Sequence, residues 1–300
     1  MPSTYSPFRY PGGKSQLYPF VANLISINSP IDTYIEPFAG GSGAALKLLF
    51  NNNVKHIIIN DFDPSIYSVW WTILNHPKYL IDKILSVPFD YYSPGIPENN
   101  IAFWKSQHQI FMKTNNDPHS LEGAFSTLFL NRTNRSGIIT GGPLGGWTQR
   151  NTLISARFNK QTLIKKISAI YKRRGDITIL KEDALLLIPK ITQYYAPQTT
   201  FIFFDPPYFD QGSHLYFSSL NRSDHQKLAK LILSLRDYKW IVTYDKNPFI
   251  WQLYAQASGR YEYFLNYSAN SHNRGKSPEF LFSSSHLQIE PFGKTKLITQ

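Results

Sequence analysis

The stretch between Tyr34 and Asp61 constrains the fold of this chain more than any other. An apolar run, Tyr34-Ile35-Glu36, leads into a glycine-rich turn and a helical run at residues 45–50, and a second apolar run at residues 56–59 ends in Asn60-Asp61. Glycines let the backbone approach a ligand closely, and an acid about twenty residues beyond such a turn stands where a ribose diol would lie. The stretch predicts a nucleotide-binding β-α-β unit.

The charge of this turn narrows the choice of ligand. The turn reads Glu36-Pro37-Phe38-Ala39-Gly40-Gly41-Ser42-Gly43, which lacks the G-x-G-x-x-G spacing of dinucleotide sites. A dehydrogenase could carry the same β-α-β unit, but Glu36 would repel a pyrophosphate. A cationic ligand fits better, and S-adenosylmethionine carries both a sulfonium and an amino group.

A second motif, Asp205-Pro206-Pro207-Tyr208, directly follows the apolar run at residues 201–204. It places a carboxylate, a carbonyl and an aromatic ring at the end of a strand, and the prolines fix φ and offer no competing N–H. Asp205 and the Pro206 carbonyl can accept both hydrogens of an exocyclic amine such as adenine N6, while Tyr208 stacks on the base. A surface turn after a buried strand is the alternative reading.

A third motif lies near the N-terminus, where Arg9-Tyr10-Pro11-Gly12-Gly13-Lys14 precedes an apolar, predicted helical segment at residues 16–27. Lys14 is positioned there to meet a carboxylate. With the motifs that contain Glu36, Asp61 and Asp205, this chain resembles the Dam-type family of adenine-N6 DNA methyltransferases. The resemblance includes the order of the motifs, extends to Leu130-Asn131-Arg132 and covers most of the chain.

The resemblance implies a role for each motif residue. Tyr10 and Lys14 would contact the methionine end of S-adenosylmethionine, and Asp61 would bind its ribose hydroxyls. Glu36 and the stretch from Phe38 to Gly41, with Gly40, would line the pocket. Asp183 would lie beside the adenine ring of the cofactor, although a helix N-terminal acid is an equally good reading of it. Asp205, Pro206, Pro207 and Tyr208 would form the catalytic motif, with Asp205 between cofactor and base.

The order of segments predicts an α/β protein with an insertion. Residues 1–74 and 161–300 alternate strands and helices, with strands near 177–180, 200–204 and 240–244, whereas residues 75–160 lose this alternation. We expect a Rossmann-like class I methyltransferase sheet, mostly parallel with an antiparallel strand near the C-terminus. We interpret residues 75–160 as an inserted, mainly helical target-recognition domain.

Base recognition needs side chains delivered into a DNA groove, so the insertion is predicted to supply them. Asn131, Arg132, Arg135 and Ser136 are the candidates. Arg274 and Lys276 lie in a further predicted phosphate-contacting loop, for which an exposed flexible loop is an equally good reading. Arg132 could instead be a helix-end cation. After Leu130-Asn131-Arg132 the sequence departs from the best-known family members, which puts their GATC target in doubt. Trp147 could fill the space left by an extruded base, but a core position is the commoner fate of a tryptophan.

Composition agrees with a nucleic-acid partner. The net charge of +11 favours a polyanion, and double-stranded DNA is the expected substrate. The absence of cysteine excludes a disulfide framework and the cysteine-dependent route of cytosine-C5 methyltransferases. The histidines have no metal-ligand spacing, so no metal is expected, and the lack of a long apolar run predicts a soluble cytoplasmic protein without a membrane partner.

Three other functions remain open on the sequence alone. Cytosine-N4 methylation uses the same geometry as adenine-N6 methylation, and RNA or a protein amide could replace DNA as the substrate. A catalytically quiet DNA-binding or cofactor-sensing protein belongs to a different class, but DNA binding alone would not require Asp205 and Tyr208. A restriction or defence-system protein is a further expected partner.

Overall fold

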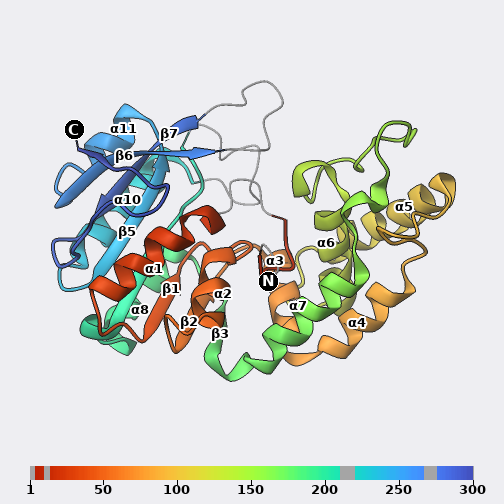
Figure 1. The fold of residues 1–300 in the computed structure, drawn as a ribbon, viewed down its shortest axis with the longest axis horizontal. Helices are drawn as coiled ribbons and strands as arrows, with labels where there is room; N and C mark the ends of the chain where they lie inside the picture. Colours follow the sequence, from red (N-terminus) through yellow and green to blue (C-terminus); the bar gives the residue numbers. More distant parts are fainter. Residues whose placement is uncertain (1–3, 10–13, 210–219, 267–275, 300) are drawn as a thin grey trace. The chain divides into compact units, whose positions relative to one another are not determined.

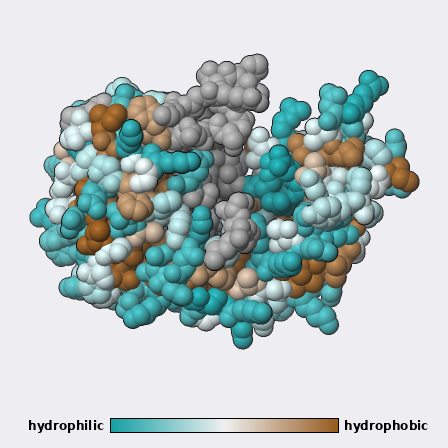
Figure 2. Space-filling model, viewed as in Figure 1, coloured by the Kyte–Doolittle hydropathy of each residue, from teal (hydrophilic) through white to brown (hydrophobic). Residues whose placement is uncertain are grey.

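The computed structural model describes residues 4–9, 14–209, 220–266 and 276–299. Two compact units divide the chain. The helical unit comprises Met1–Gly13 and Asp63–Gly175, and the sheet unit comprises Lys14–Phe62 and Asp176–Gln300. On the face shown in Figure 2, apolar residues form small patches separated by hydrophilic ones. None of the helices in the described ranges is long and apolar enough to cross a membrane.

The sheet unit is built on one eight-stranded sheet with the order β3-β2-β1-β4-β5-β7-β6-β8 (Figure 1). The strands are β1 (Thr33–Glu36), β2 (His56–Asn60), β3 (Ile177–Leu180), β4 (Thr200–Phe204), β5 (Lys239–Asp245), β6 (Gly259–Asn266), β7 (Lys276–Ser283) and β8 (Ile298–Thr299). The pairs from β3 to β5 are parallel, and β7 joins β5 and β6 antiparallel. The predicted fold class, a mostly parallel sheet with antiparallel strands near the C-terminus, is confirmed.

Helices cover this sheet. They are η1 (Lys14–Leu17), α1 (Tyr18–Ile27), α2 (Gly43–Phe50), α8 (Ala184–Tyr194), η5 (Pro197–Thr199), α10 (Arg222–Ser234) and α11 (Pro248–Leu253). Buried residues of α8, α10 and α11 form one core cluster with alternate residues of the central strands, among them Ile35, Ile58 and Ile202. Residues of those strands that point the other way, such as Tyr34 and Phe201 with their stacked rings, are also fully buried. Burial on both faces explains why the central strands are continuously apolar.

The helical unit is a bundle around one central helix. Its elements are α3 (Pro64–Asn75), α4 (Pro77–Ser86), α5 (Pro97–Thr114), α6 (Leu121–Thr133), η2 (Arg135–Gly137), η3 (Ile154–Arg157) and α7 (Lys160–Lys172), and η4 (Arg174–Asp176) lies at the junction with the sheet unit. Nearly every residue of α6 is buried, and α3, α4 and α5 all pack against it. The rings of Phe89, Phe103, Phe129 and Phe158 form an aromatic core beside α6.

The unit boundaries differ from those expected from sequence. Helices α3 and α7, assigned from sequence to the flanking segments 1–74 and 161–300, pack against the bundle and belong to the helical unit. The apolar faces of both helices can be buried only against another element, and the sequence does not reveal which one. The helical unit is therefore larger than residues 75–160, and its role in target recognition stays a prediction.

Candidate active site

Four neighbouring parallel strands each end in an acidic residue at the same edge of the sheet. In sheet order these are Asp183 after β3, Asp61 after β2, Glu36 at the end of β1 and Asp205 after β4. The carboxyl ends of parallel strands meet at one edge, and ligands of open α/β sheets bind there. The structure thus brings together acids that the sequence separates widely, and it gives this edge a strongly negative character.

The glycine-rich turn after β1 is fixed to the end of β2. The backbone N–H of Gly40 donates to Oδ2 of Asp61 at 2.7 Å, and the N–H of Ala39 donates to the carbonyl of Asn60 at 2.9 Å. Gly40 has φ 48°, a left-handed conformation that favours glycine, and Ser42 has φ 44° at the start of α2. Asp61 therefore shapes the turn, a role that its sequence position did not indicate.

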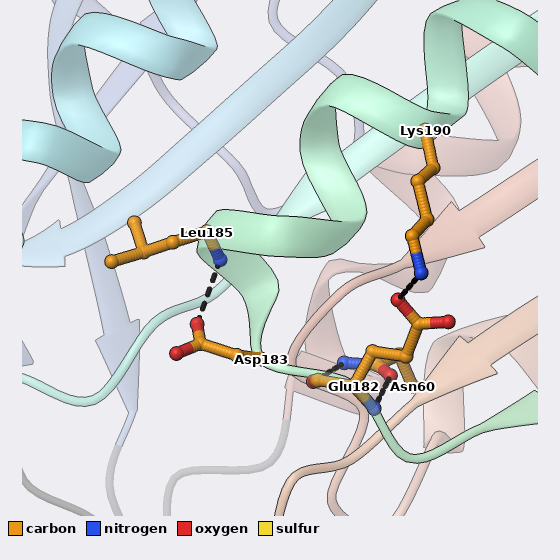
Figure 3. A network of polar contacts seen from close by, with 5 residues as sticks. All are labelled: Asn60, Glu182, Asp183, Leu185 and Lys190. Carbon is orange, nitrogen blue, oxygen red and sulfur yellow. Dashed lines mark hydrogen bonds and ion pairs between the residues drawn. The ribbon is translucent and has the colours of Figure 1, made fainter.

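Asn60 joins the loops after β1 and β3. Its side-chain N–H groups donate to the carbonyls of Pro37 and Glu182, both at 2.9 Å. Its Oδ1 accepts the N–H of Glu182 at 2.8 Å, and Figure 3 shows the two bonds between Asn60 and Glu182. The residue is 1% exposed, so an aliphatic replacement would leave three backbone groups without their partner. Asn60 thereby sets the positions of the two loops that carry Phe38 and Asp183.

Asp183 is the N-cap of α8. Its Oδ1 accepts the N–H of Leu185 at 2.8 Å, and the neighbouring Glu182 forms an ion pair with Lys190 at 2.6 Å (Figure 3). The helix-start reading of Asp183 is confirmed. No further hydrogen bond to the carboxylate of Asp183 occurs among the described residues, and its contact with a cofactor stays a prediction.

Glu36, the last residue of β1, is a buried acid at this edge of the sheet. It accepts the hydroxyl of Tyr34 at 2.8 Å and is 7% exposed. Burial raises the pKa of Glu36 to about 7, the negative charge of Asp205 adds to the rise, and hydrogen bonds from Tyr34 and Ser42 oppose it. The carboxyl group therefore changes its protonation near neutral pH.

The catalytic motif predicted from sequence begins directly after β4, which ends at Phe204. Oδ1 of Asp205 accepts the hydroxyl of Thr243, on the neighbouring strand β5, at 2.8 Å. Pro206 is buried, and Asp205, Pro207 and Tyr208 are partly exposed. The Thr243 hydroxyl restricts the rotation of the carboxylate, and the charge of Asp205 is close enough to influence Glu36.

Tyr208 is anchored through its hydroxyl. It donates to Oε1 of Glu279 on β7 at 2.5 Å, and the hydroxyl of Tyr263 on β6 donates to the other oxygen, Oε2. Glu279 is 1% exposed and lies opposite Tyr263 in the strand register. Burial, and then the charge of Glu279, raise the pKa of Tyr208 well above its ordinary value, so its hydroxyl stays a donor.

The chain beyond Tyr208 is also tied to the sheet. The N–H of Phe209 donates to Oδ1 of Asp245 at the end of β5 at 3.0 Å, and Asp245 pairs with Glu279 in the β5–β7 register. The ring of Phe209 packs against His225 and Phe249. Sequence analysis missed Thr243, Asp245 and Glu279, because only the pairing of β4, β5 and β7 brings them beside the motif.

Several predicted site residues have limited descriptions. Tyr10 and Arg274 lie outside the described residues. Lys14 begins η1 and Lys276 begins β7, and only their backbone is described. Phe38 is partly buried and packs on the core cluster of the sheet unit. The ring of Phe62, which directly follows Asp61, is exposed, and the sequence analysis gave this residue no role.

In the helical unit, the structure gives Asn131 a folding role. Its Oδ1 accepts the N–H of Arg9 at 2.7 Å, and its amide donates to the carbonyls of Arg9 at 2.8 Å and Gly137 at 2.9 Å. The residue is 1% exposed. Both amide N–H groups and the carbonyl oxygen of Asn131 are engaged inside the helical unit, which does not favour a base contact, and that contact stays a prediction.

Two further buried amides hold the loop that follows α6. Asn134 donates to the carbonyls of Ile138, Ile139 and Gly141, and Gln149 donates to those of Leu144 and Gly146. The result is an ordered loop at residues 134–154.

The exposed side chains of this loop include Arg135, Arg150 and Trp147. Trp147 is 61% exposed and packs edge-on against Trp104, so the expectation that it is a core residue is wrong. Ser136 is partly exposed with φ 57°. Arg132 is also partly exposed, and its Nη2 donates to the carbonyl of Arg157 at 2.6 Å.

Comparison with known proteins identifies the family. The profile of the D12 class N6 adenine-specific DNA methyltransferases matches residues 10–268. The chain belongs to this family. Its members act on the N6 amine of adenine in DNA, and this chain is therefore an adenine-specific DNA methyltransferase.

Two individual similarities accompany the family match. The Type II methyltransferase M.MjaIII of Methanocaldococcus jannaschii is 27% identical over 244 residues, which cover 76% of this chain and 78% of the relative. Two structures of the rRNA methyltransferase aviRa of Streptomyces viridochromogenes align with TM-scores of 0.40 and 0.39 and 14% and 12% identity. They cover 92% and 93% of this chain and 87% and 88% of the aligned chains. Among the described residues of this D12-class methyltransferase, no cluster of three or more His, Cys, Asp or Glu side chains could hold a metal ion.

Proposed function

We propose that the sheet unit binds S-adenosylmethionine at the carboxyl ends of β3, β2, β1 and β4, and that this chain methylates adenine at specific sites in double-stranded DNA. The observation that carries the proposal is the row of acids, Asp183, Asp61, Glu36 and Asp205, at one edge of the sheet. A dinucleotide would meet electrostatic repulsion there, whereas a sulfonium and an ammonium group are cations. S-adenosylmethionine supplies an electrophilic methyl group.

The cofactor contacts follow the positions of the motif residues. The turn from Phe38 to Gly41 lines the pocket, since its backbone approaches a ligand without side chains at Gly40 and Gly41. Asp61 binds the ribose hydroxyls with its carboxylate while it supports the turn. Asp183 lies near the adenine ring. Tyr10 and Lys14 contact the methionine end.

The residues after β4 act on the target base. The Asp205 carboxylate and the Pro206 carbonyl accept the two hydrogens of the amine, and this draws the nitrogen toward tetrahedral geometry. A carboxylate has about four acceptor positions, of which the Thr243 hydroxyl uses one. Asp205 also offsets the positive charge that develops on nitrogen. The ring of Tyr208, held by Glu279, stacks on the base.

Access to the amine requires the adenine to leave the duplex, because a stacked base cannot reach the motif. Stacking on an aromatic side chain stabilises an extruded base by about 1–3 kcal/mol. We assign target recognition to the helical unit, with Arg135 and Ser136 of the 134–154 loop as base-contacting candidates. Arg274 and Lys276 remain candidates for phosphate contacts. In analogy with the Type II methyltransferase relative, we include protection of DNA within a restriction system, with a restriction protein as partner.

The test is transfer of labelled methyl from S-adenosylmethionine to duplex DNA, followed by nucleoside mass spectrometry. N6-methyladenine as the only methylated nucleoside is the expected product, and sequencing of the methylated DNA would define the target. N4-methylcytosine as the product would replace the proposed substrate base. Labelling of RNA or protein, but not of DNA, would overturn the proposal.

A further inference from the structure

Four basic side chains gather where the N-terminal segment, α6, η3 and α7 meet in the helical unit. Arg9 is held there by the backbone bonds to Asn131, Arg132 lies near the C-terminal end of α6 and Arg157 ends η3. Lys166 of α7 is 9% exposed and donates from Nζ to the carbonyl of Ser6 at 2.8 Å. We call these four residues the cationic cluster.

The cationic cluster has no negative partner among the described residues. Burial, together with the charges of Arg9 and Arg157, lowers the pKa of Arg132 to about 10. Burial and the charge of Arg132 likewise lower the pKa of Lys166 to about 8. Each member thus experiences like charges, which destabilise one another in the free protein.

Two buried donors of the cluster have no acceptor. They are Nη1 of Arg9 and Nε of Arg132. A buried donor without a partner destabilises the folded state, and more so when it is charged. The described chain offers carbonyl oxygens to only two members of the cluster. An anion would satisfy the open donors and neutralise the repulsion at the same time.

We propose that Arg9, Arg132, Arg157 and Lys166 form a binding site for one backbone phosphate of the DNA substrate. The proposal rests on the DNA methyltransferase function given above. It adds a site that positions DNA on the helical unit without reading its sequence. Planar guanidinium groups match the oxygen geometry of a phosphate, and several cations around one anion suit a fully charged phosphodiester.

A phosphate explains the position of Arg132 better than a base edge does. Base readout needs a long side chain that reaches freely into a groove, whereas Arg132 is only partly exposed and its guanidinium group is bound to the carbonyl of Arg157. The neighbouring loop at residues 134–154 exposes Arg135 and Arg150, which can reach outward. The cluster therefore sets the register of the backbone, and the loop is left to contact the bases.

The test uses substitutions whose side chains have no hydrogen bonds to lose. The guanidinium groups of Arg9 and Arg157 donate to no described residue, so Arg9→Gln and Arg157→Gln remove charge with little structural loss. Arg157→Lys keeps the charge. Arg236→Gln is the matched control, since Arg236 is an exposed arginine of the sheet unit. Affinity for target and unrelated duplexes is measured in the full chain across a range of salt concentrations, together with thermal stability.

We expect Arg9→Gln and Arg157→Gln each to weaken binding of both duplexes about tenfold and to reduce the slope of log Kobs against log salt by about 0.9. The double variant should reduce the slope by no more than a single variant does, because both residues bind the same phosphate. Arg157→Lys and Arg236→Gln should keep the wild-type slope. The melting temperature of the glutamine variants should equal or exceed that of the wild type, because like-charge repulsion is relieved.

Three results would overturn the phosphate site. These are wild-type affinity and slope in both variants, weakening confined to the target duplex, or an equal effect of Arg236→Gln. Weaker binding that appears only together with a lower melting temperature would also overturn it. Methyl transfer by the wild-type protein tests the proposed function separately. If the wild type methylates DNA and the variants bind DNA normally, the phosphate site is wrong and the proposed function is kept.

Discussion

Asp205 and Tyr208 receive their orientation from different strands. Thr243 of β5 holds the carboxylate, and Glu279 of β7 holds the tyrosine hydroxyl. The motif itself was predictable, since an acid, two prolines and an aromatic residue follow an apolar run. Its two supporting residues were not, because they lie far along the chain and reach the motif only through strand pairing. The sequence also did not reveal that the Asn131 amide binds the backbone of Arg9 and Gly137.

Substitution of Asp205 tests the role of its carboxylate. Asp205→Ala should lower kcat for DNA methylation by about 10³-fold or more, because an acceptor and a compensating charge are both lost. Affinity for S-adenosylmethionine and for DNA should fall much less. Single-turnover methylation and calorimetry measure the two effects. Near-normal methylation by this variant would contradict the assigned role.

Glu279 is predicted to be a positioning residue for Tyr208. Glu279→Gln should lower kcat about 10–100-fold, because charge-assisted hydrogen bonds of about 1.5–3 kcal/mol are weakened, with little change in KM for S-adenosylmethionine. Tyr208→Phe, which keeps the stacking ring, should have a similar effect. The Glu279→Gln/Tyr208→Phe double variant should be no slower than the poorer single variant, since both changes break one bond.

Tyr263→Phe is the matched control, because it removes the other hydroxyl on Glu279 and leaves the Tyr208 bond intact. It should keep most of the activity while it lowers stability by about 1 kcal/mol. Two results would contradict the positioning role of Glu279. One is that the reductions of kcat by Glu279→Gln and Tyr208→Phe multiply in the double variant, and the other is that activity falls only in proportion to the folded fraction.

At the scale of elements, the positions of the strands and of the glycine-rich turn were predicted from the sequence, but those of helices α4 and α5 were not. The central strands are apolar runs bounded by polar motifs, so their positions agree with the prediction. The sequence predicted a mainly helical insertion but did not place helices α4 and α5 within it. Pro77 and Pro97 occupy the first positions of these helices, where a missing N–H has no effect. Composition alone does not distinguish a proline that begins a helix from one that ends it.

The end of β1 should make stability depend on pH. The pKa of Glu36 rises from 4.5 to about 7 on folding, so the folded state binds more protons than the unfolded state between these values. The free energy of unfolding should therefore fall as pH rises through this range, by up to about 3 kcal/mol. Glu36→Gln should lose this dependence. The difference in stability between this variant and the wild type should therefore favour the variant more at pH 8 than at pH 5. Denaturant unfolding at both pH values measures the difference.

The control for Glu36 is Glu290→Gln, which changes an exposed carboxylate. Its pH dependence should match that of the wild type. If Glu36→Gln keeps the pH dependence of the wild type, folding does not raise the pKa of Glu36.

At the scale of the whole molecule, sequence predicted one α/β core with a helical insertion but not where the two units divide. The loss of strand–helix alternation after residue 74 was visible, whereas the packing partner of α3 and α7 was not. The N-terminal segment shows the same limit. It was grouped with the cofactor motifs, yet Phe8 packs against Trp70 and Arg9 against Asn131, both in the helical unit. Local patterns indicate the type of an element and leave its partner open.

The net charge of +11 gives the last prediction, which concerns the whole chain. Duplex binding by a protein that neutralises several phosphates weakens steeply with salt, by about 10³-fold or more between 50 and 200 mM for six or more contacts. We expect kcat/KM for DNA to fall at least about 100-fold over this range, while affinity for S-adenosylmethionine, measured by calorimetry, changes little. The contrast is expected because the edge of the sheet proposed to hold the cofactor carries four acidic residues, so no phosphate contacts are expected in cofactor binding. A flat salt profile for kcat/KM would mean that the basic surface does not meet the DNA backbone.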